Sequence, residues 1–371
     1  MSDLGAEQEA VVHVVTNAQL RAGWEPEPGQ DPESVASITP NKRSALLSNP
    51  LLGSDDEPAQ ILLHVEDGFV GRIDLVAGEV ETPAGSIPCF WGSALQVSPA
   101  HRGRRLGATL IRASEGFREA TGASGASRMA RPVYSRLGYF DLPLRRSVLI
   151  RRTRSLVEPR LGTGPAARAA TWSGDLAATA QRSLLGLVRR GRAGSLRLER
   201  HDAFPAELEP RLRERAASFS LHRSAAWLDW VLGESFAEEH RRGLYLVVDA
   251  AGEPVAYFLL KARVYSGVTK WNLEQFDLGS LVDWRIFEPR AVRLEHLVLL
   301  ALEALDEWDV DGVEVCASDA DPVHLRRFGF LPADAQHVLL RGAEGSALDG
   351  PAARDPRAWS VRPGEGDYVF S

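Results

Sequence analysis

The 371-residue sequence predicts an α+β fold with two similar tandem domains, each a mixed, mostly antiparallel sheet flanked by helices. Three observations support this prediction. The chain is too long for one ordinary domain, strand-like and helix-like apolar patterns alternate along it, and a series of landmarks in the first half returns in the same order in the second. We expect an N-terminal domain at 1–151, a linker with a connecting helix at 152–194, a C-terminal domain at 195–341 and a tail at 342–371.

The first half alternates strand and helix patterns in a β-β-β-α-β-α-β order. A hairpin is indicated by the turn residues Glu66-Asp67-Gly68. A helix preceding the hairpin ends near Pro50, because the residue before proline avoids helical geometry. The expected strands are Ala10–Val15, Gln60–Val65, Phe69–Val76, Pro88–Val97, Ser127–Met129 and Ser147–Arg151, and the expected helices are Lys42–Leu51, Ala108–Glu119 and one around Tyr134.

The second half repeats this order after a segment rich in Gly, Pro, Ala and Arg that contains an amphipathic helix at Asp175–Arg190. The repeated landmarks are a strand at Ser195–Arg200, a helix at His222–Leu228, a hairpin of Leu244–Asp249 and Val255–Ala262, a strand at Trp271–Leu278, and His324–Pro332, which parallels Tyr134–Pro143. The tail is loop-like, and Trp359 and Tyr368 predict that part of it docks on a domain.

The composition is that of a globular protein without nucleic-acid or membrane partners. Hydrophobic residues make up 44% and charged residues 25% of the chain. A net charge of -7 opposes the counterion release on which general nucleic-acid binding depends. Neither a signal peptide nor a membrane span is expected, and we predict a cytoplasmic location. Cys89 and Cys316 lack zinc-ligand spacing and are expected to be small buried residues, with no metal in the protein.

The most informative stretch is Leu95–Leu110, where an apolar strand breaks at Pro99 and restarts as a basic, glycine-bearing helix start. The first turn of a helix has backbone N–H groups without intrahelical acceptors, and the helix dipole places partial positive charge there. Such an end binds phosphate. Arginines at 102, 104 and 105 add formal positive charge.

This stretch resembles the acetyl-coenzyme A loop of the GNAT superfamily of N-acyltransferases, with the pattern V-x-P followed by R/Q-x-x-G-x-G/A. Val97, Pro99, Arg102 and Gly107 match, whereas Arg105 stands where the family has its first glycine. A second family signature, Y-x-x-L-G-F/Y, is matched by the block Pro132–Phe140. Two ordered signatures at the family's separation are more specific than either one alone.

The resemblance implies that acetyl-coenzyme A is the acyl donor. Backbone N–H groups at Leu95–Val97 would receive the acyl oxygen and the pantetheine, and Tyr134 would protonate the departing thiolate; a core role for this tyrosine is the alternative. Ser127 takes the place of a family asparagine that touches the coenzyme. The implied coenzyme-binding residues are Leu95, Gln96, Val97, Arg102, Gly103, Arg104, Arg105, Leu106, Gly107, Ala108 and Ser127.

The acceptor side is less defined, because the strand before the loop lacks the carboxylate that often serves as general base in the family. Either a water chain removes the ammonium proton, or Glu274 and Asp277 on the corresponding strand of the second half do so across the domain interface; as the alternative, both are ordinary polar residues on a strand edge. Trp91, with Phe90, either lines an apolar acceptor slot or belongs to the core.

The favoured function is acyl-coenzyme A-dependent N-acyltransfer, most simply of acetyl, to a small amine, amino sugar or peptide-like acceptor. The second half has Asp283 and Glu288 where the first has its phosphate loop, so it is expected to be a degenerate domain that does not bind coenzyme A. Two alternatives are a Fem-like transferase that uses aminoacyl-tRNA and a non-catalytic protein that binds coenzyme A or a partner. The sequence leaves the oligomeric state open.

Overall fold

The computed structural model describes residues 10–27, 30–31, 35–65, 68–213, 219–234, 240–268, 273–318 and 322–362, apart from the side chains at 159, 267–268, 273–274 and 322–323. The predicted turn residues Glu66 and Asp67 lie outside these ranges, as do Trp271 and Tyr368. Among the described helices, none is both long and apolar enough to cross a bilayer.

The first half follows the predicted order, with longer strands than the sequence pattern indicated. Its first two helices begin after side-chain caps: Thr16 accepts a hydrogen bond from the Gln19 amide, and Thr39 accepts one from the Lys42 amide. The elements are β1 (Val11–Thr16), α1 (Asn17–Arg21), α2 (Pro40–Leu47), β2 (Pro58–Val65), β3 (Gly68–Thr82), β4 (Gly85–Val97), α3 (Leu106–Ser114), β5 (Ala120–Ser124), α4 (Arg131–Arg136) and β6 (Phe140–Ile150).

Two predictions in this half were wrong. The helix expected to reach Glu119 ends at Ser114, because Gly116 adopts a φ of 89° that breaks the helix. The strand expected at Ser127–Met129 is instead β5, whose five residues are all buried. A short run of small residues buried on both faces shows no alternation, so the pattern could not reveal it.

The second half begins after a helical connection. The predicted helix at Asp175–Arg190 is part of the 29-residue helix α6, and the expected loop before it is largely helical as well. The elements are α5 (Arg154–Leu161), α6 (Pro165–Ala193), β7 (Arg197–His201), α7 (Glu209–Leu212), β8 (Phe219–Leu221), α8 (Ala225–Gly233), β9 (His240–Val248), β10 (Pro254–Val268), β11 (Leu273–Ile286), α9 (Leu294–Asp306), β12 (Gly312–Ala317), α10 (Pro322–Arg326), β13 (Leu331–Gly342) and β14 (Trp359–Ser360).

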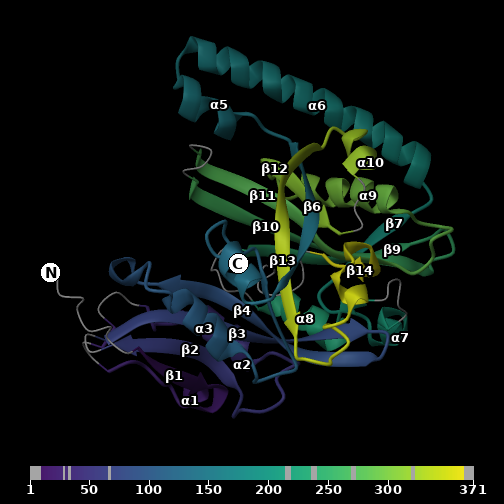
Figure 1. Cartoon of the computed structure of the whole chain (residues 1–371). Coiled ribbons are helices and arrows are strands. Elements are labelled where there is room, and N and C mark those ends of the chain that lie inside the picture. The colour runs from purple at the N-terminus through teal and green to yellow at the C-terminus, as the bar shows by residue number, and fades with distance from the viewer. Residues whose placement is uncertain are drawn as a thin grey trace.

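Within the described ranges, one sheet of fourteen strands runs through both halves (Figure 1), and twelve of these strands follow the order β1-β2-β3-β4-β5-β13-β6-β12-β11-β10-β9-β7. The last strand of each half is exchanged: β13 inserts between β5 and β6, and β6 pairs with β12. The expected boundaries at 151 and 195 therefore stay predictions, because the sheet has no break between the halves.

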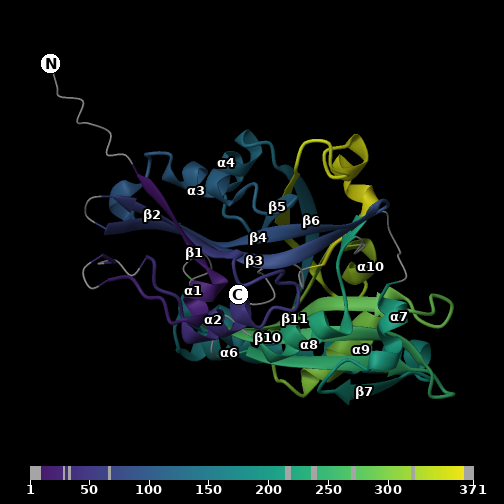
Figure 2. The ribbon, with the colours of Figure 1, turned by 90° about the horizontal axis from the view of Figure 1, so that it is seen from below.

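Helices cover both faces of each half. In the first half α3 and α4 lie on one face and α1 and α2 on the other, toward the second half (Figure 2). In the second half α6 packs with α9 on one face, and α8 contacts β9. The two cysteines are buried and unpaired, as predicted. Trp359 is 3% exposed, which confirms that the tail docks on the fold.

Candidate coenzyme site

The site begins with a bulge in β4. Ser93 pairs with Asp74 and Gln96 with Arg72, so two residues of β4 face one residue of β3. Ala94, one of these two, has a φ of 48°. The bulge redirects the last residues of β4, Leu95–Val97, toward the loop that follows.

On its other side, β4 separates from β5. The parallel pairing joins only Cys89–Trp91 to Ala120–Gly122, although β4 continues to Val97. Beyond the last pair the main chain of β4 therefore faces a gap between the two strands instead of a partner. Backbone amides on such an edge are available to an extended ligand.

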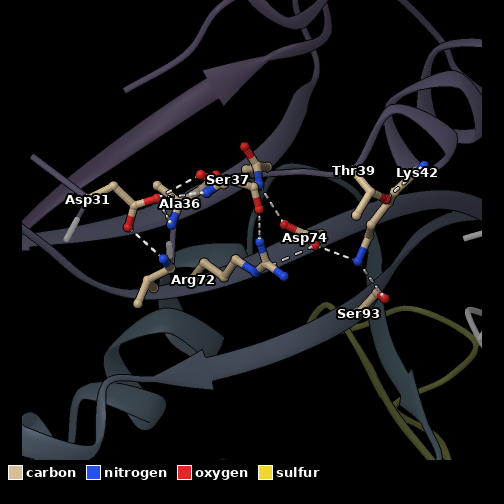
Figure 3. A network of polar contacts seen from close by, with 10 residues as sticks. Asp31, Ala36, Ser37, Thr39, Lys42, Arg72, Asp74 and Ser93 are labelled. Carbon is tan, nitrogen blue, oxygen red and sulfur yellow. Dashed lines mark hydrogen bonds and ion pairs between the residues drawn. The ribbon is translucent and has the colours of Figure 1, made fainter. Parts of the chain in front are cut away.

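A buried polar network lies behind the bulge (Figure 3). Asp74 is fully buried, and its Oδ2 lies 2.5 Å from Lys42 Nζ in α2. The same Lys42 ammonium donates to Ser93 Oγ at 3.3 Å, directly before the bulge. Gln60 donates to the other Asp74 oxygen at 2.9 Å, and Arg72 donates to the Ser37 carbonyl. The network thus ties α2 to both strands where β4 bends.

The loop after β4 leads into the N-terminus of α3 through two left-handed residues. After a 3-10 turn at Pro99–His101, Gly103 has a φ of 84° and Arg105 a φ of 63°. Arg105 therefore stands in a conformation that costs a non-glycine residue about 1–2 kcal/mol. Arg102 Nε donates to the Val97 carbonyl at 3.2 Å, which holds the loop against the end of β4.

A cavity of about 800 Å³ opens between this loop and α4. The residues that line it are Leu95, Gln96, Val97, His101, Arg102, Gly103, Arg105, Leu106, Gly107, Ala108, Arg112, Ser127, Met129, Ala130, Val133, Arg136 and Leu137. This set contains four arginines and no acidic residue. Among the described residues, no carboxylate forms an ion pair with any of these four arginines.

Every predicted coenzyme-binding residue except Arg104 lines this cavity; Arg104 is exposed and is not among the lining residues. The sequence reasoning missed His101, Arg112 and Arg136, together with apolar residues from the start and end of α4. Arg136 lies inside the second signature, two residues after Tyr134, so that motif already contained the signal. Arg112 lies about two helical turns into α3, where spacing alone could not identify it.

Tyr134 lies under this cavity instead of lining it. The side chain is 3% exposed, and its ring packs edge-to-face against Tyr139 with 4.9 Å between centroids. It belongs to a small core cluster with Ile111, Ala123 and Leu339. Ser127 lines the cavity and also accepts a hydrogen bond from the Ala130 amide at 3.2 Å, so it caps the turn that leads into α4.

The three acceptor candidates do not come together in the described structure. Trp91 is 3% exposed, and its indole packs over Gly78 and Gly122, where an added Cβ would lie within 2.5 Å of ring atoms. Asp277 forms an ion pair with Arg241, and burial raises the pKa of its carboxyl although that arginine opposes the rise. Glu274 is in β11, but its side chain lies outside the described part.

The diverging strand pair, the bulge and the loop that leads into α3 define a class: the chain has the fold of the GNAT-superfamily N-acyltransferases. No protein-family model matches the sequence, and no curated protein matches it. The likeness to solved structures therefore concerns the fold alone.

Two solved structures illustrate this likeness. Saccharomyces cerevisiae N-myristoyltransferase with bound myristoyl-CoA is 14% identical at a TM-score of 0.55, covering 96% of this chain and 86% of that chain. A GCN5-related N-acetyltransferase from Anabaena variabilis is 12% identical at a TM-score of 0.51, covering 90% and 72%. At such identities the likeness concerns the fold.

Replacing Arg105 tests the left-handed conformation at the start of α3. Arg105→Gly and Arg105→Ala remove the same charge, but only glycine adopts a φ of 63° without a steric cost. We expect the glycine variant to be more stable by about 1 kcal/mol in urea unfolding. At neighbouring Arg104, which does not have a positive φ, alanine should be at least as stable as glycine. Equal stability of the two Arg105 variants would show that the left-handed backbone at this position is not strained.

Breaking the buried ion pair tests the network behind the bulge. Lys42→Met removes the nearer of two cations from the buried Asp74 carboxylate and leaves Arg72 at 4.0 Å, so it should lower the free energy of unfolding by about 3 kcal/mol, the low end for a broken buried pair. Adding Asp74→Asn removes the charge of the buried carboxylate and should restore a large part of the lost free energy of unfolding. Urea unfolding of both single variants and the double variant gives the coupling free energy between Lys42 and Asp74. A loss below about 1 kcal/mol for Lys42→Met would show that the pair is not coupled.

Proposed function

We propose that the protein is an acyl-coenzyme A-dependent N-acyltransferase and that the cavity between the β4–α3 loop and α4 binds the coenzyme. The observation that carries this proposal is the set of four arginines without described carboxylate partners, next to a helix start on a GNAT fold. A helix N-terminus with arginines around it attracts a ligand with several negative charges. This favours a coenzyme with a pyrophosphate over aminoacyl-tRNA as the donor.

In this proposal the main chain does most of the binding. The pyrophosphate lies on the N–H groups of Gly103–Ala108, with Arg102, Arg105 and Arg136 around it. The pantetheine extends along the open edge of Leu95–Val97, and these amides also face the thioester oxygen as negative charge develops on it. The cavity volume of about 800 Å³ is within the range of cofactor sites.

The chemistry is direct attack of an amine on the thioester carbonyl. Water accepts the proton that the ammonium loses before the attack, since no carboxylate lines the described cavity. The free amine nitrogen then forms the new amide bond, the carbon–sulfur bond breaks, and the thiolate takes a proton from the hydroxyl of Tyr134, which acts from beneath the cavity. The proton that the nitrogen loses as the amide forms returns through water to the Tyr134 phenolate. We propose a small amine, amino sugar or peptide-like molecule as the acceptor.

The donor that fits best is acetyl-coenzyme A. An acyl chain that follows the pantetheine would run toward the apex of the gap, where Trp91 and Gly122 form the last pair between β4 and β5. The indole of Trp91 fills the space over Gly122. This arrangement leaves room for a short acyl group and opposes a long one.

Ligand-induced stabilisation tests the coenzyme site. Acetyl-coenzyme A at a hundred times its dissociation constant should stabilise the protein by about 2.7 kcal/mol, measured as a thermal shift. Arg136→Gln should weaken coenzyme binding, whereas Arg104→Gln, outside the cavity, should not.

The Tyr134→Phe variant should bind the coenzyme normally and turn over more slowly in a thiol-release assay. No shift with acetyl-coenzyme A or free coenzyme A would refute the proposal, and equal losses of binding and turnover would make the Tyr134 hydroxyl structural.

Donor length is tested by opening the apex. Trp91→Leu should raise kcat/KM for hexanoyl-coenzyme A relative to acetyl-coenzyme A by at least about tenfold, because accommodating even one methylene changes kcat/KM by such factors. Phe90→Leu is the matched control, since Phe90 is fully buried on the opposite face, in the cluster of β2, β3 and α3 residues. An unchanged donor ratio in Trp91→Leu would mean that the indole does not limit the acyl chain.

A further inference from the structure

A second large cavity lies away from the coenzyme site, with a volume of about 760 Å³. Its walls come from both halves: the β3–β4 hairpin, β8 with the residues after it, the end of β11, and the docked tail. Glu79 lies seven residues along β3 from Arg72, which pairs with Gln96 at the coenzyme site. At the rise of a strand these two positions are about 23 Å apart.

The cavity reaches the end of β11, which corresponds in the second half to β4, but no residue of α10 is among its described lining residues. β11 carries a bulge at Val282, because Leu259 pairs with Asp283 and Leu260 with Leu281. The residues that follow this bulge, Trp284–Ile286, line the second cavity, as Leu95–Val97 line the first. The second half therefore has a cavity beside the end of its bulged strand, with different residues around it.

Asp283, which the sequence suggested would repel an anion here, is neutralised inside the protein. It is fully buried, lies 2.8 Å from Arg223 Nε and accepts a 2.6 Å hydrogen bond from the Tyr257 hydroxyl. Glu288, the other acidic residue, forms an ion pair with Arg211 at 3.2 Å. Neither carboxylate is among the residues that line the cavity.

One wall of this cavity is rich in arginine. The five arginines that line it are Arg211, Arg213, Arg223, Arg285 and Arg362. Arg285 donates to the Leu212 carbonyl, and burial lowers the pKa of its guanidinium, with Arg223 and Arg362 adding to the effect. Arg362 stacks over the Trp284 ring, 4.5 Å from its centroid. Arg211, Arg213 and Arg223 already pair with Glu288, Glu209 and Asp283, so an anion in this cavity would be held mainly around Arg285.

The opposite wall is acidic. Glu79 and Glu81 project from the same face of β3, and His222 Nδ1 lies 3.4 Å and 3.0 Å from their carboxylate oxygens. Ser86 donates to Glu79 at 2.8 Å, which fixes that carboxylate. A second anionic group would be repelled at this wall, whereas an ammonium group would be attracted.

We propose that this cavity binds a small zwitterion, with a phosphate or carboxylate on the arginine wall around Arg285 and an ammonium group at Glu79 and Glu81. The opposite charges of the two walls fix the orientation of the ligand. The site is separate from the proposed acyltransferase site and does not depend on it. It gives the second half a ligand of its own in place of a coenzyme.

Calorimetric titration of the full chain in EDTA tests this proposal with defined probes. Phosphoethanolamine should bind at least tenfold more tightly than inorganic phosphate or ethanolamine alone, because it engages both walls. Comparing the affinities of β-alanine and phosphoethanolamine decides whether the arginine wall prefers a carboxylate or a phosphate. The proposal is overturned if neither zwitterion shows saturable binding. It is also overturned if phosphoethanolamine binds no more tightly than inorganic phosphate.

Variants assign the binding to this cavity. Arg285→Gln should weaken the tighter zwitterion at least tenfold, and Arg362→Gln is a second variant should the first fail to fold. Glu79→Gln with Glu81→Gln should reduce phosphoethanolamine binding to the level of phosphate. Arg136→Gln, in the coenzyme cavity, should leave zwitterion binding unchanged, so failure of either site is recognised separately. Zwitterion binding that survives both arginine changes would place the ligand elsewhere and overturn the assignment.

Discussion

The separation of β4 from β5 is the constraint on which the rest of the first half depends. Two adjacent parallel strands normally satisfy each other's backbone groups along their whole length, yet here the pairing stops at Trp91 and Gly122. The bulge at Ala94 turns β4 away, and the Lys42–Asp74 pair holds the neighbouring strand and helix in register behind it. The amides that remain open are a consequence of this geometry and are not supplied by any particular side chain.

Local charge at the site differs from the charge of the whole molecule. The chain carries a net charge of -7, but the cavity beside α3 is lined by arginines and by no carboxylate. Since screening limits electrostatic effects to about 8–10 Å, an anion in this cavity responds to the arginines and the helix start more than to the acidic surface elsewhere. A negative net charge is therefore compatible with a local site for a polyanionic coenzyme.

The sequence predicted the parts of the structure that depend on local geometry. A strand that breaks at Pro99, a glycine-bearing helix start and the block around Tyr134 are contiguous, so their residues reveal them, and nearly all the predicted coenzyme-binding residues line one cavity. Contacts between distant segments could not be read in this way. Neither the Lys42–Asp74 pair nor the meeting of Glu79 with His222 has a sequence pattern, because each joins elements that only the fold brings together.

The exchanged strands explain why the two halves form one unit. β13, from the end of the chain, pairs with β5 and places Leu339 in the same cluster as Ile111 and Tyr134, below the coenzyme cavity. Leu340 of the same strand packs near Gly122, beside the apex of the gap. The second half therefore supplies part of the floor of the first half's site. These contacts of β13 are packing contacts, so they do not require a ligand in the second half.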